Sequence, residues 1–184
     1  ITAEDIRYAT AMNKSIKLLG NSWRIGEQFY AMVCPMLVDN THPLSVVRDV
    51  FNAIFVRGNM IDETMFYGKG AGKLPTASAV AADVVDCVKH TGKNIKILWN
   101  PEKLELSNIG DFERRYFVRM PADTTQEVIQ DVFGTVEMVT VDGLDEKAFV
   151  TGLIKESAFN EAAEKALEAV RKCEGLTDNT RIAA

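Results

Sequence analysis

Alternation of apolar and polar positions predicts β-strands through most of the first half of the chain. Four strand-like runs stand there, separated by turn residues: 15–19, 25–38, 53–56 and 60–66. The second run is apolar at both sets of alternating positions, so we expect both of its faces to be covered, with a bend or a sheet edge at Pro35. Gly20 and Asn21 predict the first turn. Before the strands, Thr2 and Asp5 form a capping-box pattern that predicts a short helix.

A glycine-rich stretch at 67–83 joins the last of these strands to a helix. Its glycines alternate at 68, 70 and 72, and Pro75 suits the first position of the helix that follows. Valines at 80, 84 and 88 then recur on one face, which we expect to pack on the sheet. The spacing is neither that of a dinucleotide fingerprint nor that of a P-loop. Two interpretations stay equally open at this point: a tight turn that packs the helix, or backbone contact with a polar or anionic ligand.

The second half of the chain has the element order βαββαβ. Strands are predicted at 116–120, 136–141, 148–154 and 177–182, with helices that begin after Thr124 or Thr125 and after Ser157. This order is that of the ferredoxin-like split βαβ arrangement. Residues 92–112 lack a clear pattern and are interpreted as a linker. We therefore predict an α+β fold: an antiparallel or mixed sheet with helix cover over 1–91, followed by a ferredoxin-like domain over 113–184.

Composition excludes several classes of function. Lys and Arg total 21 against 26 Asp and Glu, so the formal charge is −5, and we expect no nucleic-acid partner. No apolar run is long enough to cross a bilayer and no signal peptide is visible, so no membrane partner is expected. Three widely spaced cysteines indicate the reduced thiols of an intracellular, cytoplasmic protein. His42 and His90 stand in no metal-ligand pattern, and no metal site is predicted.

The motifs, taken in order, resemble those of one enzyme family. The run Gly68-x-Gly70-Ala71-Gly72-x-x-Pro75-Thr76-Ala77-Ser78-Ala79-Val80, ending in Asp83, is similar to the C-terminal part of the catalytic domain of homoserine dehydrogenase. Upstream motifs follow in the family's order and spacing: Asp5-Ile6, Ile16-Lys17-Leu18-Leu19-Gly20, Val33-x-Pro35, His42-Pro43-Leu44 and Asn52-Ala53. Residues 113–184 are similar to the ACT regulatory module often fused behind that domain. Because the chain starts at Ile1 in the middle of the pattern, we expect a fragment of a longer protein.

The resemblance implies an oxidoreductase that interconverts L-homoserine and aspartate 4-semialdehyde with NAD or NADP, on the route to threonine and methionine. It places the nucleotide domain, the catalytic lysine and the acidic substrate ligands before the segment that matches Ile1. No catalytic residue is therefore assigned to this chain, and we expect the isolated fragment to bind no cofactor and to be inactive. In the family the last glycine of the loop approaches the cofactor. That glycine is Gly72 here, with Gly70 supporting the turn, so both are predicted cofactor-binding residues of the full-length protein, whose other ligand is a small-molecule substrate.

The ACT-like half departs from the resemblance at its effector loop. The usual Asp-x-x-Gly turn is replaced by Ala122-Asp123-Thr124-Thr125, and β-branched residues disfavour positive φ. This departure argues against effector binding at the loop and favours assembly into a homodimer or a higher homo-oligomer through sheet edges or helices. The alternative interpretation of the whole chain is a stand-alone amino-acid-binding or oligomerisation module of the ACT type.

Overall fold

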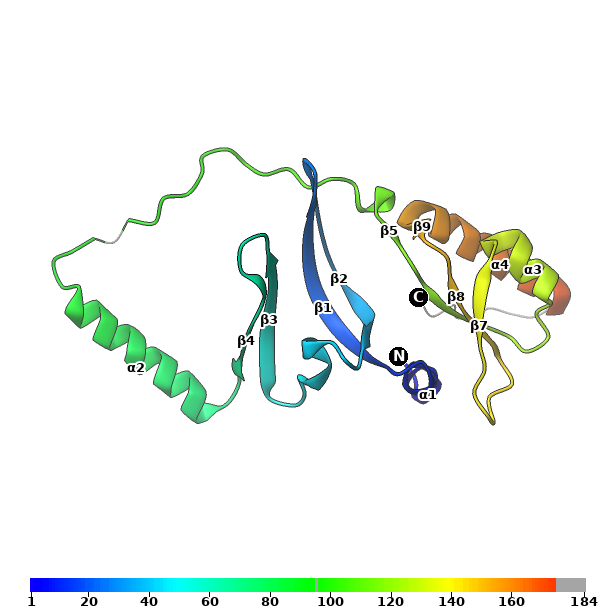
Figure 1. Ribbon diagram of the computed structural model, residues 1–184, viewed down its shortest axis with the longest axis horizontal. Helices are drawn as coiled ribbons and strands as arrows, with labels where there is room; N and C mark the ends of the chain where they lie inside the picture. Colours follow the sequence, from blue (N-terminus) through cyan, green and yellow to red (C-terminus); the bar gives the residue numbers. More distant parts are fainter. Residues whose placement is uncertain (95, 175–184) are drawn as a thin grey trace. The chain divides into compact units, whose positions relative to one another are not determined.

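The computed structural model describes residues 1–94 and 96–174 and is a mixed α/β structure with antiparallel sheets (Figure 1). The contacts between its residues divide it into two compact units. The first joins residues 1–37 to the described residues from 105 onward, and the second spans 38–104. This grouping brings the first helix and hairpin together with the C-terminal half. The domain boundaries drawn from the sequence stay a prediction.

The first unit begins with the helix α1 (Ala3–Ala11), as its capping box predicts. The Thr2 hydroxyl accepts a hydrogen bond from the Asp5 backbone N–H at 3.4 Å, and the Asp5 carboxylate accepts one from the Thr2 N–H at 2.6 Å. Two donors at the helix start are thereby satisfied reciprocally.

The strands β1 (Lys14–Ile25) and β2 (Gln28–Asp39) follow α1 and form a two-stranded sheet. The turn predicted at Gly20 and Asn21 is wrong, because β1 runs through both residues. The chain reverses instead at Gly26, which has a φ of +60°. Positive φ is what such a turn needs, and Gly20 does not adopt it. In a two-stranded sheet every strand is an edge, so Pro35 is tolerated within β2.

The expectation that β2 is covered on both faces is also wrong for the described residues. Tyr30 and Val38 are buried, whereas Val33 on the opposite face is 73% exposed. Apolar residues on both faces of a strand indicate that both faces can be buried, but the pattern does not identify the surface that covers each face.

The C-terminal part of the first unit is a sheet with two helices packed on it. Strands β6 (Phe117–Met120), β8 (Lys147–Thr151) and β7 (Val136–Val139) pair antiparallel in that order. Helices α3 (Gln126–Phe133) and α4 (Glu156–Glu174) pack with them around a core that includes Val118, Ile129, Phe149 and Phe159. A short pair, β5 (Glu113–Arg114) with β9 (Ile154–Lys155), and the 3-10 turn η2 (Ile109–Asp111) complete the C-terminal module, which we define as residues 109–174.

The first five elements of the predicted βαββαβ order are present in the C-terminal module. The strand order, with the third strand between the first and the second, agrees with a split βαβ arrangement, and the assignment as an ACT-like domain stays a prediction. The N-cap prediction is confirmed at Thr125, whose hydroxyl accepts from the Val128 N–H at 3.4 Å. The predicted last strand, 177–182, lies outside the described residues.

The second unit contains the 3-10 turn η1 (Pro43–Val46), the antiparallel hairpin β3 (Phe51–Gly58) and β4 (Asp62–Lys69), and the helix α2 (Lys73–Lys89). Both strands and the helix are predicted by the sequence. The helix begins two residues before Pro75, so the proline occupies the third helical position. It is tolerated there because the first four backbone N–H groups of a helix have no partner within the helix.

The expectation that the valine face of α2 packs on the sheet is wrong within the described structure. No residue of α2 is buried, and Val80, Val84 and Val88 are 57–68% exposed. The 3.6-residue period correctly predicts a helix with one apolar face. The surface that would cover this face is not among the residues of the second unit.

Candidate functional site

The candidate site is the glycine loop between β4 and α2, and Gly72 is its most constrained residue. Gly72 has φ +122° and ψ 154°, a region that only glycine adopts readily, and it is the N-cap of α2. It offers no side chain to cap the helix. The backbone N–H groups of Lys73 and Leu74 are therefore available at the positive end of the helix dipole. Such a terminus attracts carbonyl, carboxylate or phosphate oxygens.

Gly70 lacks a side chain for a different reason. A Cβ at this position would lie 2.1 Å from Nδ2 of Asn52, which stands on the neighbouring strand β3. The paired strands bring the two together, since Asn52 lies opposite Gly68 in the register. Gly70 thus meets a protein side chain, which accounts for its small size without a ligand. Cofactor contact at Gly70 stays a prediction, and no sequence signal marks the Asn52 contact.

By contrast, the space beside Gly72 is open. A Cβ there would meet only the ring of Pro75, at 3.5 Å and beyond, so packing within the protein does not demand a glycine. The backbone angles of Gly72, however, do require a glycine. Two of the loop's glycines therefore serve different purposes: Gly70 makes room for Asn52, and Gly72 provides an unusual backbone angle at an uncovered helix start.

The loop carries two lysines, Lys69 and Lys73, and residues 68–74 contain no carboxylate, histidine or cysteine. No group of three His, Cys, Asp or Glu residues that could hold a metal ion exists among the described residues. His42 accepts a hydrogen bond at Nδ1 from the Leu44 N–H at 3.1 Å and caps η1. His90 caps the C-terminus of α2, with Nδ1 3.3 Å from the Asp86 carboxylate. Both histidines are engaged in local structure.

In the described part of the chain, none of the helices has the length and apolar character needed to span a membrane.

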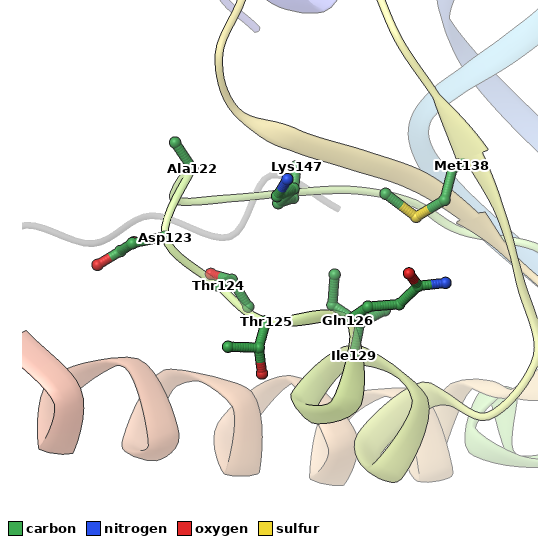
Figure 2. Close-up of a pocket in the computed structure, with 8 residues that line it drawn as sticks. All are labelled: Ala122, Asp123, Thr124, Thr125, Gln126, Ile129, Met138 and Lys147. Carbon is green, nitrogen blue, oxygen red and sulfur yellow. The ribbon is translucent and has the colours of Figure 1, made fainter.

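A hollow lies in the C-terminal module, at the loop between β6 and α3 (Figure 2). It has a volume of about 300 Å³ and is lined by Ala122, Asp123, Thr124, Thr125, Gln126, Ile129, Met138 and Lys147. Thr124 is 8% exposed, and its hydroxyl has no hydrogen-bond partner within the described protein. The sequence argued against a ligand at this loop because it lacks glycine. An unpartnered buried hydroxyl is a structural signal that the sequence does not carry.

Comparison with known proteins identifies the family. The family model for homoserine dehydrogenase matches residues 1–85. The homoserine dehydrogenase of Synechocystis is 32% identical over 197 aligned residues, which cover 94% of this chain. The chain belongs to the homoserine dehydrogenase family. The homoserine dehydrogenase of Bacillus subtilis is 43% identical over 90 aligned residues, which cover 49% of this chain.

Solved structures of homoserine dehydrogenases have the same fold. The crystal structure of the enzyme from Thiobacillus denitrificans matches all of this chain with a TM-score of 0.74 and 25% identity. That of the Staphylococcus aureus enzyme at pH 7.5 matches 87% with a TM-score of 0.61 and 27% identity. The chain spans less than half of each relative: 46% of the Synechocystis protein, 21% of the B. subtilis protein, and 44% and 41% of the two crystallised chains.

Proposed function

We propose that the protein to which this segment belongs interconverts L-homoserine and aspartate 4-semialdehyde by hydride transfer with NAD or NADP. The observation that carries the proposal is the match to homoserine dehydrogenases along nearly the whole chain, in sequence and in fold. The reaction would place the protein in the biosynthesis of threonine and methionine. The free thiols of Cys34 and Cys87 agree with a cytoplasmic location.

In this proposal Gly72 and the start of α2 form one wall of the cofactor site. The nicotinamide ring supplies the hydride chemistry when the cofactor is bound. The residues present fit such a ligand: the space beside Gly72 is open, and the N–H groups of Lys73 and Leu74 suit its oxygen atoms. We assign the groups that hold the substrate and move protons to the remainder of the protein, because residues 68–74 contain no carboxylate, histidine or cysteine.

The exposed valine face of α2 supports this arrangement. A helix of 17 residues with no buried residue lacks the tertiary contacts that normally stabilise helices in proteins. The relatives are more than twice as long as this chain, so they have further surface to cover the face. We propose that this surface carries the rest of the cofactor site.

The proposal is tested by an absorbance assay at 340 nm. The full-length protein should oxidise NADPH or NADH in the presence of aspartate 4-semialdehyde, and the 184-residue chain alone should not. A full-length protein that is folded but turns over neither cofactor would refute the function, and robust turnover by the isolated chain would refute the division of the site.

The role of Gly72 is tested by Gly72→Val in the full-length protein, with Gly68→Val as the matched control. Gly68 lies in β4, and a Cβ added there would meet nothing within 4 Å, so valine fits. We expect Gly72→Val to raise the KM for the cofactor at least tenfold, because a branched side chain blocks close approach and disfavours the backbone angle. Unchanged cofactor kinetics would make Gly72 a purely structural glycine.

A second candidate function concerns the C-terminal module, which we propose to be ACT-like. The hollow at 122–126, with its unpartnered Thr124 hydroxyl, favours a small amino-acid effector, although Thr124 and Thr125 replace the usual glycine. Threonine and related amino acids should then raise the melting temperature of the chain, and Thr124→Val should abolish the rise. The absence of any shift would leave only a role in assembly.

Assembly through the hairpin β3–β4 is the corresponding proposal for partners. Ile54 and Phe66 are 66% and 64% exposed, and no other strand of the described residues pairs with either edge of this two-stranded sheet. Edges of this kind tend to be paired or covered. Light scattering on the purified chain should show a homodimer or a higher homo-oligomer, and a monomer at all accessible concentrations would refute this.

A further inference from the structure

Residues 112–119 form a run, from the end of η2 through β5 and β6, that contacts the first 34 residues of the chain along its length. At one end Phe112 stacks on Trp23, with ring centroids 4.7 Å apart, and lies 5.2 Å from the ring of Tyr30. Toward the other end Phe117 lies 5.5 Å from Tyr8 of α1. The run is thus bordered by the hairpin β1–β2 at its start and by α1 at its finish.

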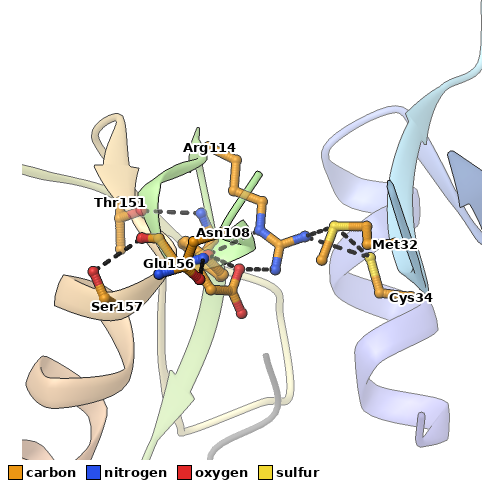
Figure 3. Close-up of polar contacts among 9 residues, drawn as sticks. Met32, Cys34, Asn108, Arg114, Thr151, Glu156 and Ser157 are labelled. Atoms are coloured by element: carbon orange, nitrogen blue, oxygen red, sulfur yellow. Dashed lines mark hydrogen bonds and ion pairs between the residues drawn. The ribbon is translucent and has the colours of Figure 1, made fainter. Parts of the chain in front are cut away.

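Arg114 links the hairpin to α4 (Figure 3). Its guanidinium donates to the sulfur atoms of Met32 at 2.7 Å and Cys34 at 3.5 Å, both on β2. The same group donates to Tyr116 Oη at 2.8 Å and pairs with the Glu156 carboxylate on α4, while the Tyr116 hydroxyl donates to that carboxylate at 2.5 Å. The Arg114 and Glu156 side chains are each only 20% exposed, so the pair is largely removed from water.

Arg119 makes the matching link to α1. It pairs with Asp5 at 2.5 Å and donates to the Thr2 hydroxyl at 2.9 Å, so it reaches the capping box itself. On its other side it forms a bidentate pair with Glu146, with both hydrogen bonds at 2.8 Å. The side chains of Arg119 and Asp5 are 13% and 6% exposed. A buried charge that loses its partner is strongly unfavourable, so the Arg119–Asp5 ion pair holds α1 against β6. The Arg114–Glu156 pair lies within the C-terminal module, and Arg114 reaches the hairpin through its hydrogen bonds to the sulfur atoms of Met32 and Cys34.

We propose that residues 112–119 are a coupling element that fastens α1 and the hairpin β1–β2 to the C-terminal module, with Arg114 and Arg119 as its positioning residues. The N-terminal helix and the module then open as one cooperative unit, and a ligand or partner that displaces β6 displaces α1 and the hairpin with it. The inference goes beyond the proposed function, since it does not depend on the reaction or on the identity of any ligand.

Hydrogen exchange of the 184-residue chain, followed by mass spectrometry at increasing low denaturant, tests the link to α1. In the unmodified chain we expect α1 and β8 to exchange through the same opening. Arg119→Met should make α1 exchange at least tenfold faster than β8. The matched control is Arg115→Met: Arg115 lies on the same run but donates to Glu137 and to the Thr151 carbonyl, both within the module.

Two results of the comparison with the arginine variants would overturn the proposal. The first is that α1 already exchanges tenfold faster than β8 in the unmodified chain. The second is that Arg115→Met and Arg119→Met change the ratio of the α1 and β8 exchange rates equally. Should Arg119→Met fail to fold, Asp5→Asn removes the same ion pair and keeps an oxygen that can accept from the Thr2 N–H. It should separate α1 from β8 in the same direction, and unchanged exchange would also overturn the proposal.

The link through Arg114 is measured by the fluorescence of Trp23. The other tryptophan, Trp99, is 83% exposed and is replaced by phenylalanine in all samples. Arg114→Met should shift the Trp23 emission to longer wavelength, because the hairpin separates from Phe112, and Arg115→Met should not. Identical emission in the Arg114→Met chain and its parent would remove Arg114 from the coupling element.

Discussion

The backbone angle of Gly72 leads to a quantitative prediction for Gly72→Ala. At φ +122° and ψ 154° an L-amino acid with a side chain is strained, at a cost of about 1–3 kcal/mol. Since 1.36 kcal/mol is tenfold in an equilibrium constant, the population of this loop conformation relative to others should fall about 5- to 150-fold. The added methyl group itself has room, because the nearest atom is the Pro75 Cδ at 3.5 Å. The substitution therefore isolates the cost of conformation from the cost of packing.

The amide of Thr76 reports this loss in the isolated chain. Its N–H donates to the Gly72 carbonyl at 3.1 Å, the first hydrogen bond of α2, and the bond requires the observed loop. Hydrogen exchange followed by NMR should show the Thr76 amide exchanging about 5- to 150-fold faster in Gly72→Ala. Gly68→Ala is the control, since Gly68 lies in a strand without a positive φ and with open space beside it. Equal protection of Thr76 in Gly72→Ala and in the unmodified chain would refute the reasoning.

Three further predictions concern the first unit. Burial, together with the hydrogen bond to Glu156, raises the pKa of Tyr116 to about 12. The contribution of its neutral phenol to stability is therefore present below pH 10.0 and is lost as the pH rises through about 12. A pH titration followed by absorbance at 295 nm should show this late transition in the unmodified chain and not in Tyr116→Phe. Although burial raises the pKa of Asp5, its hydrogen bonds with Arg119 and Thr2 hold the pKa below the ordinary 3.8. The stability that the Asp5 carboxylate contributes is therefore present above pH 3.8 and is lost as the pH falls through its lower pKa. In acid unfolding, the difference in stability between the unmodified chain and Asp5→Asn should shrink over that pH range. Phe159 is 2% exposed, and Phe159→Ala should lower the free energy of unfolding by about 3–5 kcal/mol in urea, whereas Leu153→Ala, at a side chain 72% exposed, should change it by less than about 0.5 kcal/mol.

Elements specified by their own residues could be predicted from the sequence. The capping box at Thr2, the N-cap at Thr125 and the strands β3 and β4 were all correct, because their signals lie within a few residues. The turn at Gly20 was not, because a glycine permits a turn without requiring one, and β1, paired with β2, continues through it.

The candidate site likewise combines a local feature that the sequence predicts with long-range contacts that it does not. Its position at a glycine loop before a helix is a local property and was predicted. The contact that makes Gly70 necessary depends on Asn52, eighteen positions earlier in the sequence, and on the register of β3 against β4. The pairing of Asp5 with Arg119 spans 114 positions, and no periodicity within either segment reports it. Charged residues in a strand give no indication of their partner until the fold brings them together.

The glycine loop therefore depends on two separate sources of order. Its backbone angle is local, because Gly72 adopts a conformation that other residues avoid. Its orientation is not local. Most of the stability of a helix in a protein comes from tertiary packing of its apolar face, and a single two-stranded hairpin is marginal alone in water. Here the loop joins a helix that has no buried residue to such a hairpin. Within the second unit nothing else that the structure describes fixes the direction of α2, so we infer that the surface covering its valine face also aims the N–H groups beside Gly72 at their ligand.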